Sequence, residues 1–234
     1  MLLLLTLWIV VTGLSSADAS AATTAASSAL EREATNAYNR AEYDQVLKLW
    51  YSLPAEGTTS KPLLRLAFQS SLKLGRPEEA LTLYHRLVPP DRPDDPALLR
   101  PLALSFLTSH VRNRQEHVRI EAYAILAELG LAETQAVLED GLLDNSILVR
   151  TRAADAIGKA GLAGKSGPLR RALNDATPAV RIAAMNALSE AKVTDIMPYL
   201  IEVARTDDGP ESIFASAALY RLGKQDMLTD ITGA

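Results

Sequence analysis

Three arginines recur at a spacing of 31 residues, each directly after a valine: Arg119, Arg150 and Arg181. Guanidinium groups repeated in this way could bind an anionic polymer. Each arginine also has a short polar residue six positions before it: Asn113, Asp144 and Asp175. At the next position of the series, Thr206 and Ser212, both partners are lost together. This joint loss favours a structural ladder between an interhelix turn and the next helix, formed by Asp144, Arg150, Asp175 and Arg181.

Other residues that could do chemistry lack the required pattern. The segment from Lys159 to Ser166 ends in Gly-Lys-Ser, but a phosphate-binding loop needs glycine in place of Lys159 and follows a strand. Among the three histidines, His85, His110 and His117, the last two would lie about 10 Å apart along a helix, too far to share a metal ion. HExxH, GxSxG and cysteine are all absent. We therefore expect no catalytic, cofactor-binding or metal-binding residues and no enzymatic activity.

The balance of charge argues against nucleic acid as a partner. The chain has 24 Lys and Arg residues against 28 Asp and Glu residues, a net charge of -4, and no cluster of basic residues. Binding to a phosphate backbone depends on such a cluster. Hydrophobic residues make up 48% of the chain and aromatic residues 5%, a composition that suits a globular protein of closely packed helices.

The arginines belong to a longer repeat with the same 31-residue period. One column of the repeat is always alanine: Ala122, Ala153, Ala184 and Ala215. A second column is always leucine or isoleucine: Leu126, Ile157, Leu188 and Leu219. With two columns of small or aliphatic residues, they follow offsets of 0, 3, 4 and 7, which place them on one stripe of a helix. A fixed period of helices predicts a solenoid, in which each unit buries its apolar face against the next.

A second period, of 34 residues, occupies residues 30–96. It aligns the apolar residues of two copies, among them Trp50 with Tyr84, which we expect in the core. Prolines at residues 89–96 then interrupt the helical pattern. The predicted helix at residues 97–111 fits both periods, so we expect one continuous curved rod rather than two independent globules.

Both periods resemble known families of helical repeats. The segments AYNRAEYDQVLKLW and SLKLGRPEEALTLY, within residues 30–96, are similar to tetratricopeptide (TPR) repeats. Residues 97–234 carry a recurring D-x4-VR-x2-A-x2-A-L pattern that resembles the short bacterial HEAT repeats called PBS-lyase-like, in about four copies followed by a short C-terminal cap. The resemblance implies an all-α protein, a right-handed α-solenoid of TPR-like and then HEAT-like helix pairs.

The N-terminal segment predicts export. Residues 2–14 form an apolar run, and Ala17 and Ala19 follow it as in a signal-peptide cleavage site. We expect residues 1–19 to be a signal peptide cut after Ala19, with no permanent membrane span, because the run is shorter than the roughly 20 residues that cross a bilayer. Residues 20–29 are small and polar, which is typical of a flexible tether. The sequence thus predicts a periplasmic or secreted protein.

The resemblance to HEAT repeats also indicates where a partner would bind, since the second helix of each pair lines the concave side in that family. On these helices the candidate contact residues are Ile182, Ile213, Phe214, Tyr220 and Arg221. Tyrosine and arginine often anchor protein interfaces, whereas packing against a neighbouring repeat is the alternative role. We expect a non-catalytic scaffold or adaptor that binds a protein or peptide partner.

Other functions in the same family remain as alternatives. The HEAT family includes bilin lyases and lyase chaperones, which attach chromophores to phycobiliproteins, and an enzyme subunit of that kind is the second hypothesis. The predicted leader and the lack of catalytic motifs argue against it. Some HEAT-like proteins are DNA glycosylases, a function that the acidic net charge disfavours.

Overall fold

The computed structural model describes residues 16–53, 60–206 and 209–224, and within these ranges every regular element is helical. The all-α prediction is confirmed. The chain divides into two compact units, residues 1–106 and 107–234. The boundary falls inside helix α6 (Pro96–His110), the segment that fits both sequence periods.

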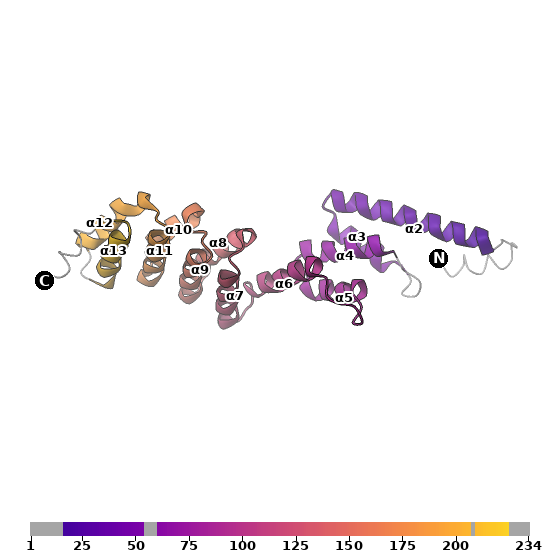
Figure 1. Cartoon of the computed structure of the whole chain (residues 1–234), viewed down its shortest axis with the longest axis horizontal. Coiled ribbons are helices and arrows are strands. Elements are labelled where there is room, and N and C mark those ends of the chain that lie inside the picture. The colour runs from indigo at the N-terminus through magenta and orange to yellow at the C-terminus, as the bar shows by residue number, and fades with distance from the viewer. Residues whose placement is uncertain (1–15, 54–59, 207–208, 225–234) are drawn as a thin grey trace. The chain divides into compact units, whose positions relative to one another are not determined.

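Unit 1 consists of two similar helix pairs followed by the first part of α6 (Figure 1). The pairs are α2 (Ser16–Asn39) with α3 (Tyr43–Tyr51), and α4 (Lys61–Lys73) with α5 (Pro77–Leu87). Both turns have the same backbone bond, from the amide of Glu42 to the carbonyl of Ala37 and from the amide of Arg76 to the carbonyl of Ser71, each 2.9 Å long. The 34-residue period of the sequence is therefore also a period of the backbone.

Large side chains fill the core of unit 1. Trp50, Phe68 and Tyr84 are almost completely buried between the four helices, which confirms Trp50 and Tyr84 as core residues. The guanidinium of Arg86 lies 4.8 Å from the centre of the Trp50 ring, close enough for a cation–π interaction. The hydroxyl of Tyr84 donates to Asp94 at 2.7 Å, so its one polar atom is satisfied at the edge of the core.

Helix α2 includes residues 20–29, which the sequence analysis assigns to a flexible tether. The composition of this segment explains why it forms a helix rather than a flexible tether. Five of these ten residues are alanine, the residue type that most favours a helix. Their continuity with Ala34 and Ala37, which are fully buried, extends the helix toward the N-terminus.

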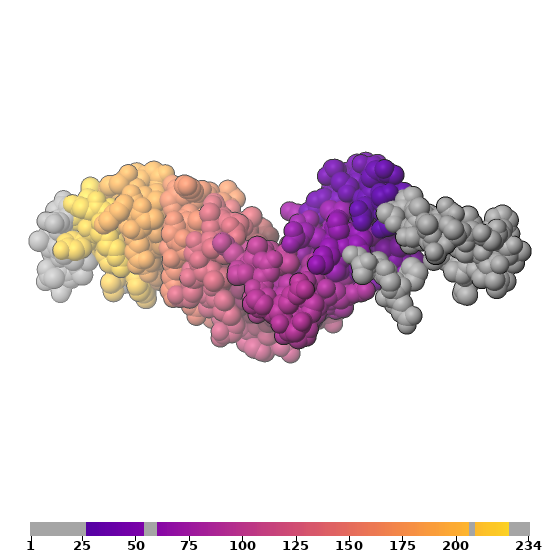
Figure 2. All heavy atoms as spheres, turned by 45° about the vertical axis from the view of Figure 1, so that its right-hand side comes forward, coloured from indigo at the N-terminus to yellow at the C-terminus, as the bar shows by residue number. Residues whose placement is uncertain are grey.

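Unit 2 alternates long helices with short ones. In chain order its elements are α7 (Glu116–Leu129), η1 (Ala132–Thr134), α8 (Gln135–Asp140), η2 (Gly141–Leu143), α9 (Ile147–Lys159), η3 (Ala163–Lys165), α10 (Gly167–Arg171), η4 (Ala172–Asn174), α11 (Pro178–Glu190), η5 (Thr194–Ile196), α12 (Met197–Thr206) and α13 (Pro210–Arg221). The long helices α7, α9, α11 and α13 lie side by side in that order (Figure 1). In the space-filling view their side chains pack without a break along the row (Figure 2).

The 31-residue period recurs in the backbone of unit 2. Three helix ends share an amide-to-carbonyl bond of 3.0 Å, which joins Leu162 to Ile157, Val193 to Leu188 and Lys224 to Leu219. The residue before each of these amides has a positive φ: Gly161, Lys192 and Gly223. Glycine adopts this left-handed conformation without strain, whereas Lys192, with φ of 57°, adopts it at a cost. The same turn therefore closes three successive long helices.

Small residues let these long helices approach closely. The alanine column and the leucine or isoleucine column are buried in all four helices. A Cβ atom built at Gly158 of α9 would lie only 2.8 Å from the Cβ of Ala187 in α11. One at Gly141 would lie 2.7 Å from the Cβ of Ala153. Both glycines thus stand where neighbouring elements leave no room for a side chain.

Parts of the sequence-based prediction fall outside the described residues. These parts are the apolar run at residues 2–14 and the C-terminal cap beyond residue 224. In the ranges that the structure describes, no helix combines the length and the apolar character that a membrane crossing needs.

Candidate functional site

Each repeated arginine of unit 2 makes a two-pronged ion pair with a carboxylate. Nε and Nη2 of Arg119 donate to the two carboxylate oxygens of Asp144 at 2.9 and 3.0 Å. Arg150 repeats this geometry with Asp175, at 2.9 and 3.1 Å. In both cases the carboxylate lies 25 residues after the arginine, in the turn that leads to the next long helix. The ladder therefore joins one repeat to the following one.

The arginine's third nitrogen binds the backbone within its own repeat. Nη1 of Arg150 donates to the carbonyl of Asp144 at 2.9 Å, and Nη1 of Arg181 donates to the carbonyl of Asp175 at 2.7 Å. The sequence analysis groups each arginine with the aspartate six positions before it, and the bond between them runs to the aspartate's backbone carbonyl rather than to its carboxylate. The side chain of Asp144 accepts from the amide of Ser146 at 2.8 Å and points toward Arg119 of the preceding helix, so Arg150 reaches only its backbone.

The last step of the ladder uses a residue that sequence reasoning missed. Thr206 stands where the series requires an aspartate, and Glu211 of α13 takes over the role. Its Oε1 accepts from Nε of Arg181 at 2.7 Å, and its side chain is buried. Glu211 occupies the column held by Val118, Val149 and Val180 in the earlier copies. The sequence did contain a signal for this role: a charged residue stands at a position that is valine in the other three copies, and such a residue needs a partner of opposite charge.

All three guanidinium groups are fully engaged by the protein itself. The pKa of Asp175 is lowered, chiefly because Arg150 donates hydrogen bonds to its carboxylate. The same bonds raise the pKa of Arg150, and those with Glu211 raise the pKa of Arg181. Since each guanidinium already donates to a carboxylate and to a backbone carbonyl, an external anion would have to displace these acceptors. The arrangement is that of a structural network and not of an anion-binding site.

A different surface of unit 2 carries exposed and partly exposed side chains. We call it the open face: the exposed or partly exposed side of the four long helices, made by Ile120, Leu148, Thr151, Arg152, Asp155, Ile182, Asn186, Ile213 and Phe214. Among these, the large apolar side chains of Leu148, Ile213 and Phe214 are 61%, 60% and 38% exposed. Three of the five predicted contact residues, Ile182, Ile213 and Phe214, lie on it.

Tyr220 and Arg221 have different surroundings. Tyr220 continues the column of Ala127, Gly158 and Ser189, which in the earlier helices faces the next long helix, as the approach of Gly158 to Ala187 shows. Tyr220 is exposed because α13 is the last long helix of the described row, so no further long helix covers this column. Arg221 donates to Asn186 of α11 at 3.0 Å, and Nζ of Lys192 donates to the Arg221 carbonyl. Arg221 thus helps to hold α13 against α11.

A pocket of the open face lies between α7 and α9. Its lining residues are Ile120, Leu148, Thr151, Arg152 and Asp155, and its volume is about 270 Å³. Burial raises the pKa of Asp155. None of these five lining residues is among the contact residues predicted from the sequence. The available signal was Leu148 itself, because the other copies have His117, Ala179 and Pro210 at that position.

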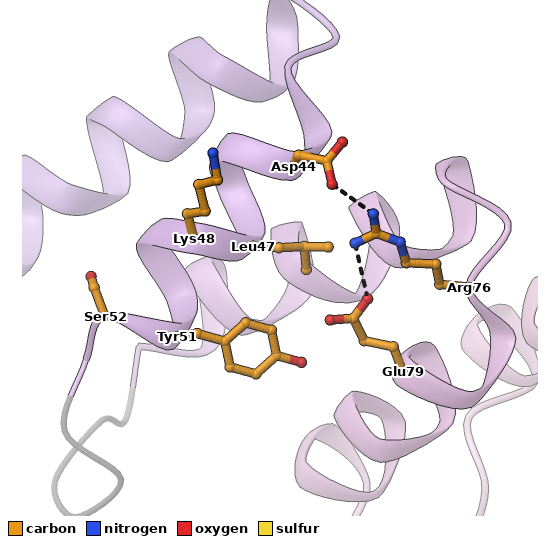
Figure 3. A pocket seen from close by; sticks show the side chains of 7 residues that line it. All are labelled: Asp44, Leu47, Lys48, Tyr51, Ser52, Arg76 and Glu79. Atoms are coloured by element: carbon orange, nitrogen blue, oxygen red, sulfur yellow. Dashed lines mark hydrogen bonds and ion pairs between the residues drawn. The ribbon is translucent and has the colours of Figure 1, made fainter.

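A larger pocket in unit 1 lies between α3 and α5 (Figure 3). Its lining residues are Asp44, Leu47, Lys48, Tyr51, Ser52, Arg76 and Glu79, and its volume is about 510 Å³. Arg76 crosses its rim, with one nitrogen 2.7 Å from Asp44 and another 3.6 Å from Glu79 (Figure 3). Both carboxylates thus neutralise the arginine. Through Asp44, Arg76 links the second helix pair of unit 1 to the first, as the ladder arginines link successive repeats in unit 2.

The weaker candidates for chemistry have ordinary structural positions. Ser166 of the Gly-Lys-Ser segment accepts from the amide of Leu169 at 3.1 Å and caps α10. His85, His110 and His117 lie on exposed surfaces. Across the described ranges, no three histidine, aspartate or glutamate side chains are grouped closely enough to hold a metal ion.

Comparisons with known proteins give no independent guide. No protein-family model matches the chain, and no curated protein matches its sequence.

Proposed function

We propose that this chain is a non-catalytic scaffold or adaptor that binds a protein or peptide partner on the open face of unit 2. The observation that carries the proposal is the set of large apolar side chains on that face. Leu148, Ile213 and Phe214 remain exposed although each adjoins a well-packed core. Adjoining exposed apolar side chains, such as Ile213 and Phe214 on α13, commonly mark a binding surface.

The proposed architecture is a right-handed α-solenoid of TPR-like helix pairs followed by HEAT-like pairs. Its support is the recurrence of one turn geometry at 34-residue spacing in unit 1 and another at 31-residue spacing in unit 2. In such a stack, each repeat contacts only its neighbours and the second helices form an extended surface. The open face is then the concave, partner-binding side.

The proposed location is periplasmic or secreted. It rests on the apolar run at residues 2–14 and the small residues that precede the predicted cleavage after Ala19. In this proposal the mature protein has no permanent membrane span.

Paired variants of the full chain test the proposed binding surface. We would replace Ile213 and Phe214 together by serine, and use Leu143→Ser as the matched control, since Leu143 is 84% exposed but lies in η2 and away from the open face. Each protein is used to capture envelope proteins, which are then identified by mass spectrometry. We expect the double variant to lose its specific partner and the control to retain it.

The result that contradicts the proposal is equally plain. A double variant that melts like the wild type and still captures the same protein would exclude this face as the binding site. Circular dichroism of all three proteins provides the folding control.

A further inference from the structure

The pocket between α7 and α9 combines two features that together select its ligand. Aliphatic side chains form one part of its lining, from Ile120 and from Leu148. The other part is polar, with the carboxylate of Asp155 and the guanidinium of Arg152. Its volume of about 270 Å³ is below the roughly 300 to 1,000 Å³ of typical small-molecule sites, which favours a single side chain as the occupant.

Asp155 is a carboxylate without a partner. In the part of the chain that the structure describes, it forms neither a hydrogen bond nor an ion pair, although it is only partly exposed. Arg152 and Lys159 of its own helix attract it electrostatically, and Glu190 of α11 repels it, but neither cation bonds it. Arg152 makes no ion pair with it, and Lys159 pairs instead with Glu128 of α7 at 3.8 Å. A group that covers this pocket would leave Asp155 unsatisfied unless it brings a hydrogen-bond donor, and a cationic donor would bind the carboxylate most strongly.

We propose that this pocket binds the side chain of a lysine or arginine from the protein or peptide partner. The methylene groups of such a side chain would pack on Ile120 and Leu148, while the cationic end would reach Asp155. The net charge of -4 on the chain also favours the approach of a basic segment. This inference rests on the proposed function, because it names the kind of residue that the open face recognises.

The charges around the pocket make a prediction that a purely structural role would not make. Arg152 lies in the same lining and repels an incoming cation. Removing its charge should strengthen binding, whereas removing the charge of Asp155 should weaken it. Opposite effects from two residues three positions apart on one helix cannot follow from a general loss of stability.

The test uses the ¹⁵N-labelled full chain and a short blocked peptide whose central lysine is flanked by alanines. A second peptide has norleucine in place of the lysine, which keeps the aliphatic stem and removes the charge. We expect the lysine peptide to shift the amide signals of Ile120, Leu148 and Asp155 in a saturable way. The norleucine peptide should bind about tenfold more weakly, since a hydrogen bond to a charged group contributes about that much.

Three variants complete the design. Asp155→Asn should weaken lysine-peptide binding about tenfold, Arg152→Gln should strengthen it, and Asp140→Asn, an exposed carboxylate at the end of α8, should leave it unchanged. Thermal melting of each variant checks the fold. Equal binding of the two peptides, or undiminished binding to Asp155→Asn, would overturn the inference.

The capture experiment separates this inference from the proposed function. If Asp155→Asn still captures the partner that the Ile213 and Phe214 variant loses, the open face binds a partner but not through a basic side chain in this pocket. If the lysine peptide binds as expected and no captured protein depends on Ile213 and Phe214, the pocket assignment stands and the partner contact proposed at Ile213 and Phe214 is wrong.

Discussion

The two units join their repeats by different physical means. Unit 1 fills the space between helices with aromatic rings, and its ion pair between Arg76 and Asp44 is largely exposed, with side chains 47% and 59% accessible. Unit 2 brings its helices close through alanine and glycine, and its Arg150–Asp175 pair is largely covered, with side chains 15% and 14% accessible. Where small residues draw helices together, the charged groups at the helix starts lose water and need permanent partners.

The largest expected effect is in the aromatic core of unit 1. Trp50→Ala should destabilise the protein by about 3–5 kcal/mol, because it leaves a large cavity beside Phe68 and Tyr84. Urea denaturation followed by circular dichroism measures the change. The matched control is Tyr51→Ala, the next residue on the same helix, which is 57% exposed and should cost less than about 1 kcal/mol. Equal losses would show that the rings do not carry the core.

The ion pairs of the two units should differ in strength. Arg150→Ala should cost about 2–3 kcal/mol, since it leaves Asp175 covered and unpaired. Arg76→Ala should cost less than about 1 kcal/mol, because both partners are already in contact with water. Denaturation of both variants under one set of conditions gives the comparison. A cost for Arg76→Ala that matches that of Arg150→Ala would remove the distinction between the units.

The close packing of α9 against α11 in unit 2 can be tested by adding one methyl group. Gly158→Ala adds a Cβ atom that would lie 2.8 Å from the Cβ of Ala187, and overpacking of this kind costs about 1–3 kcal/mol. Gly164→Ala is the matched control, because its new Cβ meets no atom within 4 Å and its φ is not positive. The melting temperatures should separate the two. A neutral Gly158→Ala would mean that α9 and α11 are not in close contact.

A smaller effect is expected at the equivalent turns of unit 1. Ala41 has φ of 58° where the second copy has Gly75 with φ of 66°. Ala41→Gly should therefore stabilise the protein by about 1 kcal/mol, and Gly75→Ala should destabilise it by a similar amount. Thermal melting of the two variants measures both. Changes of the same sign would show that the two turns do not share one conformation.

The smallest expected effect is the change in the ladder's contribution to stability with pH. The hydrogen bonds from Arg150 hold the pKa of Asp175 below its unfolded value of about 3.9. A carboxyl with a lowered folded pKa stabilises the protein above its unfolded pKa, and this contribution is lost as the pH falls through the folded pKa. The stability difference between wild type and Asp175→Asn should thus narrow below about pH 4. Denaturation at neutral and acidic pH measures it, and a constant difference would contradict the pairing.

Sequence periodicity was sufficient to predict the buried columns but not the bonds between repeats. Alanine and leucine at fixed offsets leave only one side of a helix for the core, so Ala153 and Leu188 could be placed in advance. The partner of Arg150 could not, because Asp144 and Asp175 are equally repeated and only the direction of each side chain distinguishes them. Glu211 was missed because it fills the role of an aspartate from another position in the repeat.

The candidate site was less predictable than the fold. Ile182, Ile213 and Phe214 follow from helix periodicity, since their positions lie opposite the buried stripe. Tyr220 shares a column with residues that face the next helix, and this direction depends on how neighbouring helices approach one another. The pocket at Asp155 depends on two helices at once, and a single-helix pattern does not contain that information.

A double-mutant cycle on the ladder tests the account most directly. Alanine is introduced at Arg150, Asp175 and Asp144, alone and in the two pairs that include Arg150, and the free energy of unfolding is measured for each protein. We expect the coupling of Arg150 with Asp175 to exceed about 1 kcal/mol and to be clearly larger than its coupling with Asp144. A larger coupling with Asp144 would mean that the arginine binds within its own repeat, and the proposed link between successive repeats would be contradicted.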